Sequence, residues 1–290
     1  MGILLGLLTA VTWGGADFLA RFATHRIGTL RTMLYMQFTG FLLLSLFMLR
    51  FGGWGHLMDG SGWQPWAWGA LAGCINACAT LSLYRSFEIG KMAVVAPLSA
   101  SYPVLTVLLS VLSGESLTVT RGVGIVLTLI GAVTVARGEK PSATASAEEA
   151  QRSGKGIGWA VASGIGFGLL FWLLGNHIVP RVGAAQTVWL IRITSVVLTT
   201  AIILLAKQPI GLPRDSTRGW VLGMGLLDTS AFVLSNHGMQ MEQVSVVSVL
   251  GSLYGAVTVA LAAIFLREHV SRAQWFGIIT IFAGIYLISR

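Results

Sequence analysis

Two acidic residues, Asp17 and Asp228, lie well inside long apolar stretches of the sequence. An ionisable side chain costs about 2.5–3.5 kcal/mol to place at the centre of a membrane helix, so few are present without a function. Trp13, Asp17 and Arg21 follow at intervals of four residues, which puts them on one face of a helix. That face could bind a charged group of a substrate or carry a proton, with Trp13 as an aromatic wall. The alternative is a neutralised Asp17–Arg21 pair near a helix end, with Arg21 reaching the interface.

Arg192 lies in the middle of another apolar stretch, with Trp189 and Thr199 on the same helix face. An Arg at that depth is expected to face a cavity or a carboxylate, and it could hold an anionic group such as a substrate carboxylate. It could also cap the carbonyl groups of a helix end, or form a structural pair with Asp228. If transport is coupled to protons, Asp17 or Asp228 should carry the proton.

Further polar residues in apolar stretches are expected to face the same cavity. These residues are Asn76, Tyr84, Ser99, Tyr102, Asn236 and Ser252. Pro97 and Pro103 interrupt the backbone hydrogen bonds of one stretch, and such breaks often lie at a cavity. They predict either a hinge that flexes during transport or a static kink.

The composition indicates that these residues are held by membrane helices. Of the 290 residues, 54% are hydrophobic and only 10% are charged, and the mean hydropathy is +0.77. Soluble domains carry about 25% charged residues, so an ordinary soluble enzyme and a disordered chain are excluded. Ten runs are long enough to span a membrane. They are 2–23, 29–49, 66–87, 92–113, 119–137, 156–178, 184–206, 218–238, 243–266 and 271–289.

The chain divides into two similar halves, 1–137 and 156–290, joined by a polar linker at 138–155. Residues of the two halves match at a nearly constant offset; one such match places Gln37 on Arg192. Each half has five runs, so the second half enters the membrane from the opposite side. The predicted fold is an all-α polytopic membrane protein with ten transmembrane helices in two inverted five-helix repeats. Such repeats build a site near the midplane that can open to either side, which favours a transporter.

Motifs for other chemistry are missing from the sequence. Cys74 and Cys78 have no further metal ligand at suitable spacing, and Gly164–Gly168 lacks the strand that a dinucleotide loop requires. We therefore predict no metal, no cofactor and no enzymatic activity. An intramembrane enzyme or lipid-handling protein without a recognisable motif is the alternative. The expected partners are a small solute, membrane lipids and coupling protons, without nucleic acid. The chain would act as a monomer or homodimer in a bacterial inner (plasma) membrane.

Several short motifs occur in both halves and resemble the EamA type of the drug/metabolite transporter superfamily. In the first half they are Trp13-Gly14, Ala96-Pro97, Tyr102-Pro103, Gly114-Glu115, Gly124 and Gly131; in the second they are Arg192, Arg267-Glu268, Gly277 and Gly284. The resemblance implies a central cavity lined by helices 1–4 and 6–9, with helices 5 and 10 peripheral. It implies transport, usually export, of a small metabolite such as an amino acid.

The sequence departs from that family pattern at two places. Gly255-Ala256 replaces a frequent Pro, which predicts that the second half lacks one helix break, and Gln37 replaces a frequent Arg. We interpret Glu115 and Glu268 as structural residues near helix N-termini.

The charge distribution and the family resemblance predict opposite orientations. Lys and Arg gather in the connections after the first, third, fifth, seventh and ninth runs. The positive-inside rule then puts the linker in the cytoplasm and both termini outside. The resemblance implies cytoplasmic termini.

Overall fold

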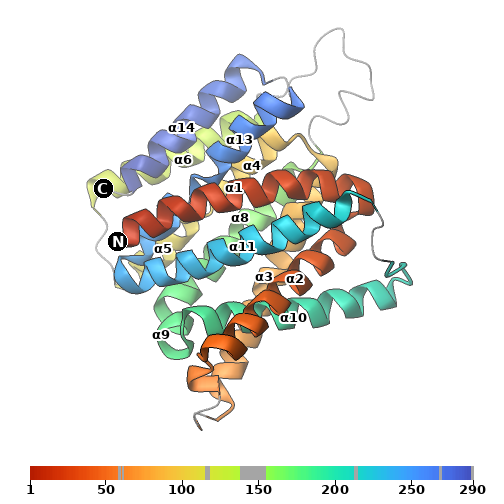
Figure 1. Ribbon diagram of the computed structural model, residues 1–290. Helices are drawn as coiled ribbons and strands as arrows, with labels where there is room; N and C mark the ends of the chain where they lie inside the picture. The colour runs from red at the N-terminus through yellow and green to blue at the C-terminus, as the bar shows by residue number, and fades with distance from the viewer. Residues whose placement is uncertain are drawn as a thin grey trace.

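A computed structural model describes residues 1–57, 60, 62–114, 118–137, 155–211, 215–267 and 270–288. All regular secondary structure in these residues is helical (Figure 1). The α-helices are α1 (Gly2–Ile27), α2 (Thr29–Phe51), α3 (Gln64–Ile89), α4 (Met92–Ala100), α5 (Pro103–Leu112), α6 (Val119–Arg137), α8 (Ile157–Leu173), α9 (Val179–Val182), α10 (Ala184–Leu205), α11 (Thr217–Met241), α12 (Val244–Ser252), α13 (Tyr254–Leu261) and α14 (Arg272–Ile288). Glu115, Glu268 and residues 138–154 of the predicted linker lie outside the described residues, so their assignments stay predictions.

Seven of the described helical segments are long and apolar enough to cross a membrane. They are Gly2–Ile27, Thr29–Phe51, Gln64–Ile89, Met92–Leu112, Ile157–Val182, Ala184–Leu205 and Val244–Leu266. Two shorter apolar helices, Val119–Thr134 and Arg272–Ile288, match the fifth and tenth predicted runs. α11 covers the eighth run but carries several polar residues, among them Asp228 and Asn236. The protein is therefore a multi-pass membrane protein, while the count of ten crossings remains a prediction.

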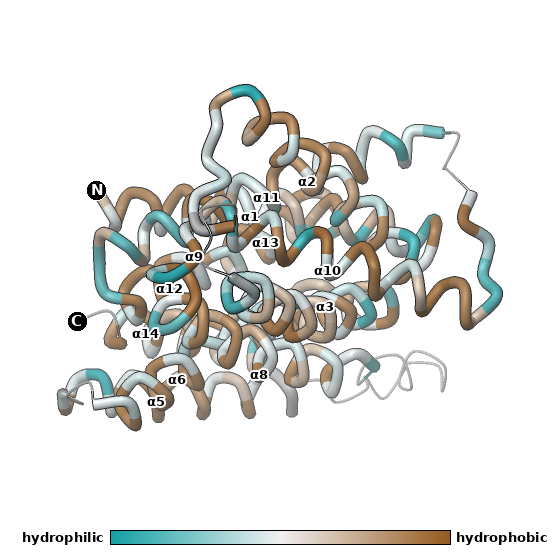
Figure 2. The backbone as a smooth tube through the Cα atoms, turned by 90° about the horizontal axis from the view of Figure 1, so that it is seen from below, coloured by the Kyte–Doolittle hydropathy of each residue, from teal (hydrophilic) through white to brown (hydrophobic). Residues whose placement is uncertain are grey.

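The outer surface of the helices is apolar, as lipid requires. Large side chains such as Leu46, Leu205 and Phe276 are more than half exposed. Figure 2 shows apolar residues along the helices, with hydrophilic residues mostly at helix ends and in the connections. A soluble monomer rarely exposes so much apolar surface, so these faces fit contact with acyl chains.

α6 and α14 pack closely against each other at one edge of the molecule (Figure 1). Their contact depends on glycine: a Cβ on Gly124 would lie 2.7 Å from the Gly284 carbonyl oxygen, and one on Gly131 would lie 2.7 Å from that of Gly277. Small residues let membrane helices approach to backbone contact. Neither helix lines the cavity described below, which agrees with the peripheral position expected for the fifth and tenth helices.

Two helical segments are interrupted where they pass the centre of the molecule. The first stops after Ala100 and resumes at Pro103. The second segment, α12–α13, stops after Ser252 and resumes at Tyr254. The expectation that the second half lacks one helix break, because Gly255-Ala256 replaces Pro, is therefore wrong. At Leu253 the chain tightens into hydrogen bonds between residues three apart, with Leu253 donating to the Leu250 carbonyl at 3.2 Å. A helix can therefore be interrupted without Pro.

Candidate substrate cavity

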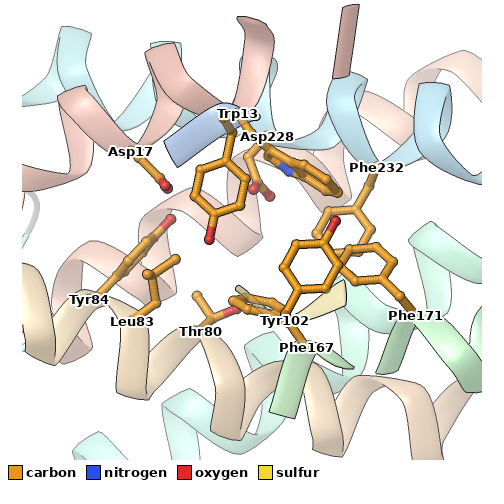
Figure 3. A pocket seen from close by; sticks show the side chains of 11 residues that line it. Trp13, Asp17, Thr80, Leu83, Tyr84, Tyr102, Phe167, Phe171, Asp228 and Phe232 are labelled. Atoms are coloured by element: carbon orange, nitrogen blue, oxygen red, sulfur yellow. The ribbon is translucent and has the colours of Figure 1, made fainter. Parts of the chain in front are cut away.

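A small cavity lies between the two halves of the chain, where the interrupted helices meet α1, α3, α8 and α11. Its lining residues are Trp13, Asp17, Thr80, Leu83, Tyr84, Tyr102, Phe167, Phe171, Asp228, Phe232 and Tyr254 (Figure 3). The cavity volume is about 30 Å³. Because a single water needs roughly 10–15 Å³ on this measure, the cavity has room for only a few waters. A molecule larger than a few waters would fit only if the groups around the cavity moved.

Asp17 projects from the middle of α1 into this cavity. The residue is 6% exposed, and its Oδ2 atom has no hydrogen-bond partner among the residues that the structure describes. Figure 3 shows the Asp17 carboxyl and the Tyr84 hydroxyl pointing toward one another. A buried acceptor without a partner is costly, so a bound molecule that donates to it would gain the full benefit of the contact.

The wall beside Asp17 is built from aromatic rings. Trp13, one turn before Asp17, makes edge contacts with Phe171 at 5.4 Å and Phe232 at 5.2 Å between ring centroids. Tyr102 packs on Phe171 at 4.9 Å. The Tyr102 hydroxyl donates to the Ser248 carbonyl at 2.8 Å and so ties the interruption of the first helical segment to α12. The rings come from helices of both halves, which makes the cavity sensitive to relative movement of the halves.

Asp228, on α11, also lines the cavity and is paired with Arg192. The Arg192 Nη2 atom lies 2.5 Å from Asp228 Oδ2, and Nη1 donates to Gln37 Oε1 at 2.6 Å. The guanidinium carbon lies 5.2 Å from the centre of the Phe232 ring. Arg192 is fully buried but does not line the cavity. The predicted Arg192–Asp228 pair is therefore present, and Asp228 lines the cavity at the same time.

Arg21 belongs to α1, lies outside the cavity lining, and reaches the C-terminal end of α3 with its side chain. It donates hydrogen bonds to the carbonyl groups of Phe87 and, at 2.8 Å, Gly90. A cation is favoured at a helix C-terminus because the last carbonyls have no partner within the helix. Arg21 therefore bonds to the end of α3, and its place in a substrate site stays a prediction.

Comparison with known proteins identifies the family. The model of the EamA-like transporter family matches residues 1–137 and 154–290. The chain belongs to this family. The Uncharacterized protein MJ1333.1 of Methanocaldococcus jannaschii is 29% identical over 132 residues, which are 45% of this chain and 93% of that protein. A crystal structure of a protein with 19% sequence identity superposes with a TM-score of 0.73, covering 99% of this chain and 95% of its own, and shows a shared fold.

The cavity of this EamA-family chain contains five of the twelve predicted substrate-binding residues. They are Trp13, Asp17, Tyr84, Tyr102 and Asp228. The other seven are Arg21, Asn76, Ser99, Trp189, Arg192, Asn236 and Ser252, and they lie outside the lining.

Most of these other residues bond to the protein itself. Ser99 donates to the Ala160 carbonyl at 3.2 Å, Asn236 to that of Ala184 at 3.2 Å and Ser252 to that of Val249 at 2.7 Å. Asn76 Nδ2 lies 3.4 Å from Ser195 Oγ, and Trp189 Nε1 donates to Ser45 Oγ at 2.9 Å. The Ser252 bond stays within α12, and the others connect separate helices; none of these groups belongs to the cavity lining.

Sequence reasoning missed six lining residues. They are Thr80, Leu83, Phe167, Phe171, Phe232 and Tyr254. One signal was present in the sequence: a shift of 154 residues between the two halves places Trp13 on Phe167, and both lie in the cavity wall. The repeat also aligns Gln37 with Arg192, and the two side chains are bonded to each other at 2.6 Å. Apart from this alignment, the sequence does not indicate whether an apolar residue in an apolar helix faces the cavity or the lipid.

Proposed function

We propose that this chain is a secondary transporter that exports a small polar or amphipathic metabolite by alternating access around the cavity. The observation that carries this proposal is Asp17, whose buried carboxylate oxygen has no partner and faces a cavity shared by both halves. In a membrane such an unsatisfied group is expensive and marks a pathway for a solute or an ion. Asp17, with Asp228 nearby, is the candidate site for a coupling proton.

The architecture supports alternating access. The family model matches two stretches of similar length, and the relative from M. jannaschii is about half as long as this chain. Each matched stretch contains one interrupted segment, α4–α5 or α12–α13, and both interruptions lie at the cavity. This correspondence favours ten spans in two inverted repeats. Rocking of one repeat against the other would then open the cavity to either side in turn.

The interruptions are the proposed hinges. Pro97 lies inside α4 and Pro103 begins α5, so two backbone donors are missing where this segment passes the cavity. Leu253 provides the corresponding turn in the second half. A backbone with fewer internal hydrogen bonds bends at lower cost, which would allow the rings of the aromatic wall to move apart.

The plasma membrane is the proposed location of the protein.

Counterflow in sealed vesicles tests this proposal. Purified protein is reconstituted, loaded with a mixed metabolite pool and exposed to trace amounts of labelled pool. We expect uptake that Asp17→Asn and Asp228→Asn strongly reduce, while Asp215→Asn, at an exposed residue outside the helices, leaves it unchanged. Equal counterflow by all three variants would show that the carboxylates are not part of the pathway. Vesicles without any counterflow would refute transport of the solutes in the pool.

A further inference from the structure

We propose that the solute is an organic cation, an ammonium group on an apolar body, without a carboxylate. This inference rests on the proposed function and narrows its substrate class. The described residues that line the cavity include two carboxylates and three phenols but no Lys, Arg or His. Arg192 compensates the charge of Asp228 through their contact at 2.5 Å, so Asp17 is the charge left for a solute to neutralise.

The polar atoms without partners in the lining are those that an ammonium group needs. Asp17 Oδ2 and Tyr254 Oη are both buried and make no hydrogen bond. An ionised carboxylate only accepts hydrogen bonds, and a phenol oxygen can accept one. An ammonium group supplies donors and a full positive charge, and either oxygen can accept a hydrogen bond from it.

The rest of the lining suits a cation that is only weakly hydrated. Trp13, Phe171 and Phe232 contact one another at ring centroid distances of 5.2–5.9 Å, and their faces could surround a cationic head. Aromatic faces attract organic cations, whereas Na⁺ and Mg²⁺ prefer shells of oxygen ligands. The protein already places one organic cation against these rings, because the Arg192 guanidinium lies over the Phe232 ring at 5.2 Å.

A solute carboxylate has no comparable place. The only buried unpartnered donor among the described lining residues is the neutral Tyr254 hydroxyl, whereas the unpartnered Arg192 Nε and Gln37 Nε2 atoms belong to residues outside the lining. An anionic group in the cavity would instead meet Asp17. The assignment of an amino-acid carboxylate to Arg192 would require the guanidinium to leave Asp228 and Gln37. We therefore expect discrimination against zwitterions as well as against anions.

Binding of four probes of similar shape tests this inference. Phenethylamine and benzyltrimethylammonium are cations, phenylalanine is a zwitterion and 3-phenylpropionate is an anion. Affinities are measured by calorimetry on the full chain in lipid nanodiscs at constant sodium concentration. Both cations should bind at least about tenfold more tightly than the other two probes, and Asp17→Asn should weaken them about tenfold or more. Asp215→Asn is the matched control and should change nothing.

Tyr254→Phe keeps the ring and removes only the hydroxyl, so it decides the question even if Asp17→Asn fails to fold. It should weaken phenethylamine severalfold and leave benzyltrimethylammonium unchanged, because the latter has no N–H donor. Three results would overturn the inference. The zwitterion or the anion could bind more tightly than the cations, or neither cation could bind. Folded Asp17→Asn could also bind the cations with the same affinity as the unchanged protein. Counterflow of the metabolite pool would continue in those cases if the transport proposal is correct. Cation binding without any counterflow would instead overturn transport alone.

Discussion

Replacing Arg192 by Met leaves the Asp228 carboxylate without the partner that lies 2.5 Å away. The Arg192 side chain is 0% exposed and that of Asp228 is 13% exposed, so water can compensate little of the loss. Removing one member of a buried ion pair costs about 3–5 kcal/mol, because the remaining charge is desolvated and unpaired. The loss of the 2.6 Å bond to Gln37 and of the contact with Phe232 acts in the same direction.

A double-mutant cycle separates the pair from these other contacts. We expect Arg192→Met and Asp228→Asn each to destabilise strongly, while the double variant costs clearly less than the sum, since it leaves no unpaired charge. The free energy of unfolding is measured by denaturant titration in detergent micelles, followed by circular dichroism. A coupling on the order of 1–3 kcal/mol would agree with the buried geometry.

The exposed pair Arg26–Asp215 provides the matched control, with side chains 58% and 48% exposed and 2.9 Å between the charged atoms. Hydrogen bonds from Thr217 hold the pKa of the Asp215 carboxyl below its ordinary value. Water screens both groups, and the cycle Arg26→Met/Asp215→Asn should show little coupling. Strict additivity at Arg192 and Asp228, or equal coupling in the two cycles, would refute the argument from burial.

Three further predictions concern packing, the linker and orientation. A Cβ on Gly40 would clash with Thr229 Oγ1 and lie 3.0 Å from Arg192 Nε, so Gly40→Ala should destabilise by about 1–3 kcal/mol in the same titration. Gly158→Ala, where a Cβ meets nothing within 4 Å, is its control, and equal stability of the two variants would contradict the close packing of α2 on Thr229 and Arg192. Deletion of 140–152 should leave the yield and the thermal stability of the protein unchanged, and loss of folded protein at unchanged synthesis would show that the segment is not a passive linker. A cysteine at Ser146 in a cysteine-free variant should resist an impermeant thiol reagent in intact cells and react after lysis; labelling in intact cells would favour the orientation that the family resemblance implies.

Much of the helical framework could be predicted from the sequence because the information is local. A run of apolar residues long enough for the membrane must form a helix, since lipid cannot satisfy the backbone polar groups. The predicted run 92–113 corresponds to α4 and α5, and 271–289 corresponds closely to α14. Asp17 and Asp228 were identifiable for a similar reason: the cost of an acid in an apolar run depends on the run itself and not on its neighbours in space.

The composition of the cavity depends on how the helices cross, and no single helix determines that. Arg192 and Asp17 have the same sequence signal, an ionisable residue in an apolar run, yet only Asp17 reaches the cavity. Phe232 and Tyr254 look like ordinary membrane residues in the sequence, but the crossing of α11 and α13 with α1 turns them toward Trp13. The sequence by itself determined which segments are helical and which charges are too costly to be accidental. The tertiary structure alone decided which side chains converge, because convergence depends on contacts between residues far apart in the chain.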